Sequence, residues 1–119
     1  EMIAVVVSST NQCEYCIKHH REALNHYWKD DARIDLLIQQ NDSVQLSEQD
    51  KALCKFARDI TLNPELSTQP KIDELRNKGF DDRSILDATL VASYFNFVNR
   101  IVLTLGLEIN HSELTGYNY

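Results

Sequence analysis

The sequence predicts an all-α fold, a compact helical domain of about five or six helices that spans residues 1–119. Only three Gly and two Pro occur in 119 residues, too few for the turns of a many-stranded protein. Apolar residues recur mostly at helical spacing, and capping residues mark where segments begin and end. The length suits one domain with its own core. The first residue is Glu1 and not Met, so we expect that residues are missing before it.

Three helices are predicted in the first third of the chain. Residues 1–9 are ambiguous, because Ile3 and the run Val5, Val6 and Val7 favour a strand by propensity, but we expect a buried helix. A second helix is predicted over residues 11–28, with Asn11 as its N-cap and Glu14 three residues later, as in a capping box. A short third helix is expected over residues 31–40. Its apolar stripe is Ile34, Leu37 and Ile38.

Three more helices are predicted after residue 46. Ser47, with Asp50 three residues later, starts a helix that Pro64 stops. The next begins at Thr68 or Gln69, before a Pro, and a Gly at position 79 closes it.

The longest predicted helix covers residues 82–105 and ends at Gly106. Its second half is apolar nearly all round, so we expect it to be buried on more than one side, with the extra cover from another copy of the chain. No regular structure is predicted for residues 107–119.

Charge and cysteine content exclude several classes of protein. The net charge of −6, without a cluster of Lys and Arg, argues against binding to nucleic acid or an anionic membrane surface. No apolar run approaches the roughly 20 residues of a membrane span. Three cysteines, two of them in a tight pair, do not resemble the disulfide framework of a secreted protein. We therefore expect a cytoplasmic protein.

The segment 13–20 carries the chemistry. In a helix, Cys13, Cys16 and His20 share one face, because they are spaced three and four residues apart. Cys13 is predicted in the first turn, where unpaired backbone N–H groups stabilise a thiolate, the reactive form.

These residues favour redox chemistry. A thiolate attacks an electrophile such as a peroxide, the resulting sulfenic acid condenses with the second thiol, and an external dithiol reduces the disulfide. His20 would accept the thiol proton, and Glu1, Glu14 or Glu22 would orient its ring. Spacing does not choose among these carboxylates.

Two other interpretations use the same atoms. A structural zinc site needs four ligands, for which the sequence offers only isolated candidates: His19, His26, His111 and, less suitably, Cys54. Alternatively, the two cysteines are ordinary helix residues. We expect no metal and no cofactor.

Several polar or reactive residues outside this motif are expected to be structural. Cys54 lies on an amphipathic helix and is predicted to be a small core residue. Asn96, Asn99 and Arg100 stand among apolar residues, so they either bond across a subunit contact or line a pocket.

The pattern Cys13-x-x-Cys16-x-x-x-His20, with Glu1 twelve residues before Cys13, resembles the alkylhydroperoxidase D-like (AhpD-like) branch of the carboxymuconolactone decarboxylase superfamily. Residues 1–8, 51–57, 75–82 and 94–100 resemble its peroxidase-related subgroup. Position 15 is Tyr, where some peroxidases of the family have a second histidine.

The resemblance implies an all-helical protomer that forms trimers or hexamers and reduces hydroperoxides. It implies that Cys16 is the peroxidatic cysteine, that Cys13 is the more accessible resolving one, and that His20 and Glu1 form a proton relay. It also implies re-reduction by a dithiol, in some bacteria a lipoylated carrier protein. Decarboxylases of the superfamily lack the cysteine pair. The alternatives are a general thiol-disulfide oxidoreductase and a non-enzymatic, zinc-stabilised module.

Overall fold

The structure is a computed structural model that describes residues 1–66, 69–110 and 112–114. These residues form helices and no strand, so the all-α prediction is confirmed. The helices are α1 (Met2–Thr10), α2 (Glu14–Trp28), α3 (Asp31–Ile38), α4 (Glu48–Leu62), the 3-10 turn η1 (Pro64–Leu66), α5 (Gln69–Asn77) and α6 (Asp82–Leu105).

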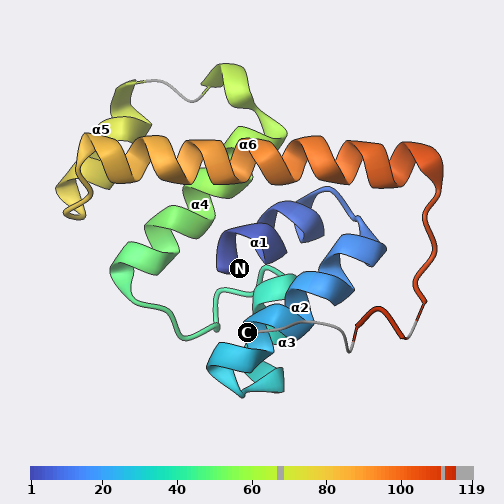
Figure 1. Cartoon of the computed structure of the whole chain (residues 1–119). Helices are drawn as coiled ribbons and strands as arrows, with labels where there is room; N and C mark the ends of the chain where they lie inside the picture. Colours follow the sequence, from blue (N-terminus) through green and yellow to red (C-terminus); the bar gives the residue numbers. More distant parts are fainter. Residues whose placement is uncertain (67–68, 111, 115–119) are drawn as a thin grey trace.

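Helix α1 lies at the centre of the fold. It packs against α2, α3, α4 and α6 (Figure 1). Its consecutive residues Ala4, Val5, Val6, Val7 and Ser8 are all fully buried. Neighbours therefore surround the helix, and their packing outweighs the strand propensity of the valines. The choice of a helix for residues 1–9 is confirmed.

The predicted start of the second helix is wrong. Helix α2 begins at Glu14, and its N-cap is Cys13. Asn11 is instead the C-cap of α1, and Gln12 turns the chain between the helices with a φ of 56°. Asn11 does not cap α2 because its side-chain amide is bonded to α6. Cys16, and not Cys13, therefore lies in the first turn.

Local capping sets the ends of the later helices. The Oγ of Ser47 accepts a hydrogen bond of 3.0 Å from the backbone N–H of Asp50, which confirms the predicted start of α4. Gly106 ends α6 with a φ of 64°, the left-handed conformation that glycine adopts without strain.

Other boundaries differ slightly or are not described. Helix α3 ends at Ile38, two residues before the predicted end, where Gln39 is its C-cap. Thr68 lies outside the described residues, and α5 begins at Gln69. Residues 107–110 and 112–114 contain no helix or strand, as predicted, and the other tail positions fall outside the described residues.

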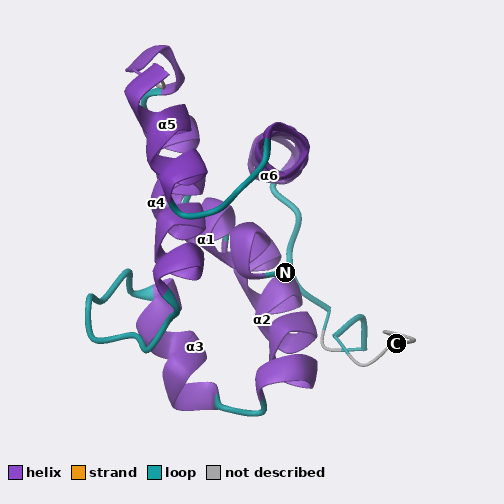
Figure 2. Cartoon of the chain, turned by 90° about the vertical axis from the view of Figure 1, so that its left-hand side faces the viewer, coloured by secondary structure: helices purple, strands orange, loops and turns teal. Residues whose placement is uncertain are grey.

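Only one face of α6 is buried within this chain. Figure 2 looks along α6. One side of this helix lies against α1 and α4, and its opposite side faces away from the described helices. A stripe of large apolar residues on the helix is 42–69% exposed: Leu86, Leu90, Tyr94, Phe97, Ile101 and Leu105. The described residues therefore bury α6 on one side only and leave the apolar stripe on its opposite side uncovered.

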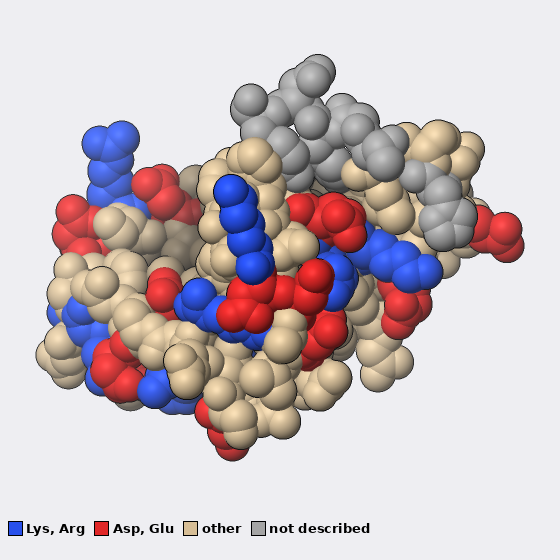
Figure 3. Space-filling model, turned by 90° about the horizontal axis from the view of Figure 1, so that it is seen from below, with Lys and Arg blue, Asp and Glu red and all other residues tan. Residues whose placement is uncertain are grey.

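By length and composition alone, α6 is apolar enough to cross a membrane, which corrects the expectation that no such segment exists. A single helix of this kind is a weak indication, because core helices of soluble proteins satisfy the same test. On the face shown in Figure 3, Lys and Arg side chains lie among Asp and Glu and do not gather into one basic area.

Candidate active site

The two cysteines at the start of α2 are in direct contact. The Sγ atoms of Cys13 and Cys16 are 2.6 Å apart, and both residues are free thiols. The two sulfur atoms therefore need to approach by less than about 1 Å to form a disulfide bond. Cys13 is 0% and Cys16 is 3% exposed, so both thiols are buried. The exposed fraction does not single out one of them, and the greater accessibility of Cys13 stays a prediction.

The environment of the pair is apolar. Val98 and Val102 of α6 and the side chain of Tyr15 pack against the two thiols. This burial, followed by the hydrogen bond to Cys13, raises the pKa of Cys16 to about 12. Cys16 therefore keeps its proton at neutral pH unless a base removes it.

Asn99 of α6 lies beside Cys16. Its side chain is fully buried, accepts a hydrogen bond of 3.0 Å from the amide of Asn11 and donates one of 3.3 Å to the Oγ of Ser8. A side-chain hydrogen bond from Asn99 also reaches the Cys16 sulfur and acts to lower the pKa of that thiol. Sequence reasoning noted that Asn99 would be costly to bury, but it did not connect Asn99 with the cysteines.

A network of amides fixes the orientation of Asn99. The Nδ2 of Asn11 donates to the Oδ1 atoms of both Asn96 and Asn99, each at 3.0 Å. Asn96 in turn donates to Thr61 at 2.9 Å and accepts from Arg100 at 2.9 Å. Because the Oδ1 of Asn99 is the acceptor, its NH₂ group is directed toward Ser8 and Cys16. All of these bonds lie within one chain. Asn96 and Asn99 therefore find hydrogen-bond partners without a subunit contact, which was one of the two roles expected for them.

His20 lies one turn beyond Cys16 and is paired with Glu1. Its Nδ1 is 2.9 Å from the Oε2 of Glu1, and the side chains are 17% and 34% exposed, respectively. The hydrogen bond with His20 is the main cause that lowers the pKa of Glu1. A carboxylate only accepts hydrogen bonds, so Nδ1 carries the proton and the Nε2 of a neutral His20 is free to act as a base. Among the three candidate carboxylates, the structure pairs Glu1 with His20.

The other candidate ligands lie elsewhere. The ring of His19 contacts that of Tyr15, with centroids 4.5 Å apart, and its Nε2 is 3.9 Å from Glu113. His26 packs against the ring of Tyr27, and His111 lies outside the described residues. Within the described ranges, no group of three or more His, Cys, Asp or Glu side chains is arranged to hold a metal ion.

Cys54 is separate from the pair. It lies in α4, is 5% exposed, and belongs to the core around α1, as predicted. Burial raises the pKa of Cys54 to about 12, so this thiol keeps its proton at neutral pH.

A hollow of about 200 Å³ gives access to the cysteine pair. Its walls come from the start of α2 and the end of α6, and include Cys13, Tyr15, Val102, Leu103 and Leu107. Beside it, the hydroxyl of Tyr15 donates a hydrogen bond of 3.1 Å to Glu113 of the tail. Cys13 lines this hollow, and Cys16 does not.

Comparisons with known proteins identify relatives of this chain in sequence and in fold. Residues 1–59 match the carboxymuconolactone decarboxylase family. An uncharacterized peroxidase-related protein from Silicibacter sp. TM1040 superimposes on 96% of this chain with a TM-score of 0.90 and 30% sequence identity. The AhpD core structure of an uncharacterized peroxidase-related protein from Ralstonia eutropha JMP134 covers 95% of the chain, with a TM-score of 0.87 and 26% identity.

A further relative is the uncharacterized protein YdfG of Bacillus subtilis (strain 168), which is 26% identical over 106 residues, or 89% of this chain. The chain spans 72% of the length of YdfG and 60% of each of the two solved structures.

Proposed function

Because this chain belongs to the carboxymuconolactone decarboxylase superfamily and resembles its AhpD-like members in fold, we propose that it is a thiol-dependent peroxidase that reduces hydroperoxides. The observation that carries the proposal is the 2.6 Å contact between Cys13 and Cys16, one helical turn along α2 from the hydrogen-bonded pair of His20 and Glu1. Two thiols in contact can store the two electrons that a peroxide takes, and the histidine can move the proton.

The first step is the attack of Cys16 on the peroxide. The Nε2 of His20 takes the proton of the Cys16 thiol, and the imidazolium that forms is stabilised by the carboxylate of Glu1. The Cys16 thiolate, which accepts the hydrogen bond from Asn99, attacks the peroxide oxygen. An S–O bond forms, the O–O bond breaks, and the leaving alkoxide takes the proton from His20 as an alcohol.

The second step closes the disulfide. The Cys13 sulfur attacks the sulfenic acid on Cys16, an S–S bond forms, and water leaves with the Cys13 proton. An external dithiol then reduces the disulfide by exchange and is itself oxidised. We propose that the reductant reaches Cys13 through the hollow, since that cysteine lines its wall, and that the peroxide enters by the same route to reach Cys16, which contacts Cys13.

We also propose that a second copy of the chain covers the exposed apolar stripe of α6, as part of a homo-oligomer. Six large apolar residues at a spacing of three or four form a continuous surface of the kind that marks protein contacts. A hollow of about 400 Å³ on this helix, beside Phe97 and Ile101, would accept a side chain of the partner. Light scattering should show a stable oligomer, which Leu90→Glu should dissociate; a monomeric wild type would refute the proposal.

The peroxidase proposal is tested by thiol titration before and after one equivalent of cumene hydroperoxide. The expected result is the loss of two thiols and a Cys13–Cys16 link found by mass spectrometry. Peroxide consumption should disappear in Cys16→Ser and fall sharply in Cys13→Ser, while Cys54→Ser serves as the matched control and keeps its activity. Peroxide consumption that persists in Cys16→Ser would refute the assignment of Cys16 as the attacking thiol. Trapping with dimedone in the Cys13→Ser variant shows whether Cys16 carries the sulfenic acid.

A general thiol-disulfide oxidoreductase is the second candidate, since the contact between the two thiols would serve it equally well. It would be favoured if the peroxide reacted with the protein no faster than with free cysteine while small disulfides were reduced rapidly. The third candidate, a zinc-stabilised module, is tested by metal analysis of the purified protein. About one zinc per chain would support it, and no zinc would exclude it.

A further inference from the structure

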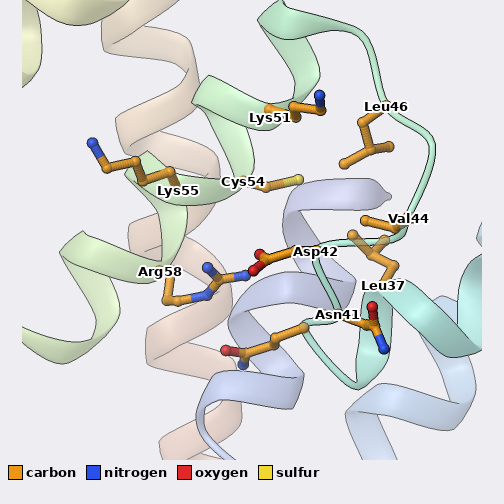
Figure 4. A pocket seen from close by; sticks show the side chains of 10 residues that line it. Leu37, Asn41, Asp42, Val44, Leu46, Lys51, Cys54, Lys55 and Arg58 are labelled. Atoms are coloured by element: carbon orange, nitrogen blue, oxygen red, sulfur yellow. The ribbon is translucent and has the colours of Figure 1, made fainter.

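Another cavity, of about 240 Å³, lies away from the cysteine pair between α3, the loop after it and α4. Figure 4 shows side chains from these three segments around one space. One wall is apolar, formed by Leu37, Val44, Leu46 and the thiol of Cys54. It shares no lining residue with the hollow at Cys13.

Arg58 lines this cavity and lacks an acceptor. The Nε of its guanidinium is buried and has no hydrogen-bond partner. Among the hydrogen bonds and ion pairs of the described residues, none involves the Arg58 side chain, although several other arginines and lysines are paired. Arg58 as a whole is half-buried, but its buried Nε–H is a donor without an acceptor, which is costly. A bound group that accepts from this N–H would remove that cost.

The other charged residues of the cavity are already satisfied or solvated. Lys51 is paired with Glu48 at 2.9 Å, and Lys55 with Glu74 at 2.8 Å, and both lysines are more than half exposed. Asp42 is exposed on the loop, and Figure 4 shows its carboxylate directed toward the guanidinium of Arg58, although the two side chains form no ion pair. Arg58 is therefore the one cation of the lining that has both a buried donor and no partner.

We propose that this cavity binds a small organic carboxylate with an apolar body. The carboxylate accepts two hydrogen bonds from the guanidinium of Arg58, the bidentate geometry that arginine favours. The hydrocarbon part lies against the apolar wall. Because the volume is below the roughly 300 to 1,000 Å³ of pockets for drug-sized ligands, the ligand is a short-chain acid. The proposal does not rest on the peroxidase chemistry, since the two sites are separate.

The test is a titration of the full chain with three small molecules that carry the same branched hydrocarbon group. Binding is measured by calorimetry and by the shifts of backbone and methyl NMR signals. The three molecules are 4-methylpentanoate, L-leucine, which adds an ammonium group, and 3-methylbutylamine, which lacks the carboxylate. We expect saturable binding of a carboxylate with a Kd at or below about 1 mM. Tighter binding of L-leucine identifies an apolar amino acid as the ligand, with Asp42 facing its ammonium, and tighter binding of 4-methylpentanoate identifies a simple fatty acid.

Variants assign the binding to Arg58. Arg58→Met keeps the aliphatic stem and should weaken binding about ten-fold or more, because a charge-assisted hydrogen-bond pair is lost. Lys55→Met is the matched control on the same helix, and its effect should be less than about two-fold. Arg58→Lys, which retains the charge, should fall between them, and it serves as the second variant if Arg58→Met unfolds.

Four results would overturn the proposal. They are the absence of saturable binding up to about 10 mM, binding of the amine as tight as that of the carboxylates, unchanged affinity in folded Arg58 variants, and shifts confined to residues around Cys13. None of them bears on peroxide consumption, so this proposal and the peroxidase proposal fail separately.

Discussion

Replacement of Asn99 by Leu tests whether the buried amide stabilises the Cys16 thiolate. The variant keeps a similar side-chain volume but removes the hydrogen bond to the sulfur, together with the bonds to Ser8 and Asn11. Without the donor, the ionised form of Cys16 is less stable, so the pKa of Cys16 rises further.

The size of the effect follows from the strength of one hydrogen bond to a charged group, about 1.5 to 3 kcal/mol. One pKa unit corresponds to about 1.4 kcal/mol, so the pKa of Cys16 should rise by about 1 to 2 units. At a fixed pH below the pKa, the thiolate population and the alkylation rate then fall about 10- to 100-fold. The free energy of unfolding should also fall by about 1 to 3 kcal/mol, because the buried hydroxyl of Ser8 loses its hydrogen bond from Asn99.

The assay uses a background of Cys13→Ser and Cys54→Ser, in which Cys16 is the only thiol. The change in its pKa is measured from the ratio of the iodoacetamide labelling rates of the variant and its background at the same pH, between about pH 7 and 9. Asn96→Leu is the matched control, because Asn96 belongs to the same network but bonds Thr61 and Arg100. It should lower stability and leave the pKa of Cys16 unchanged. A pKa in Asn99→Leu within about 0.3 units of its background would refute the reasoning.

Three further predictions concern pH and stability. In the wild-type chain, the rate at which iodoacetamide labels Cys16 should rise about ten-fold per pH unit between about pH 7 and 9, because the pKa of about 12 lies above this range. A labelling rate that reaches a plateau within this range would contradict the prediction. Ser47→Ala should lower the free energy of unfolding in urea by about 1 kcal/mol, since the N–H of Asp50 loses its acceptor, and an unchanged midpoint would be inconsistent with this cap. The hydrogen bond with His20 holds the pKa of Glu1 below 4.5, so ionised Glu1 stabilises the fold above that pH and loses this contribution as the pH falls through the lowered pKa. The difference in melting temperature between wild type and Glu1→Gln should therefore shrink below about pH 4.5, and a pH-independent difference would argue against the pairing.

Features set by neighbouring residues were predictable from the sequence. The start of α4 at Ser47 and the end of α6 at Gly106 depend on side chains and backbone angles within a few residues. The spacing of Cys13, Cys16 and His20 could also be assessed locally, because it requires only that the segment be helical. The helix at residues 1–9 was harder to predict, because its conformation depends on burial by four other helices.

Features set by distant contacts were not predictable in this way. Asn11 is a good N-cap by residue type, but its amide bonds to Asn96 and Asn99, 85 and 88 residues away. The burial of Cys13 likewise depends on Val98 and Val102 of α6, together with neighbours in α2. The one available signal for Asn99 was an amide in the middle of an apolar helix, which indicates a buried partner but not its identity.

The central position of α1 has a consequence for how the protein is made. The helix that closes over α1 along its length, α6, ends at Leu105, so about 95 residues must leave the ribosome after α1 before its neighbours are complete. At translation rates of about 5 to 20 residues per second, this takes roughly 5 to 20 s. Until α6 is made, the run Val5, Val6 and Val7 lacks the cover that this helix provides. An incompletely covered apolar segment with strand propensity is the type of sequence that starts aggregation. Nascent chains that stop before α6 should therefore depend on chaperones to stay in solution.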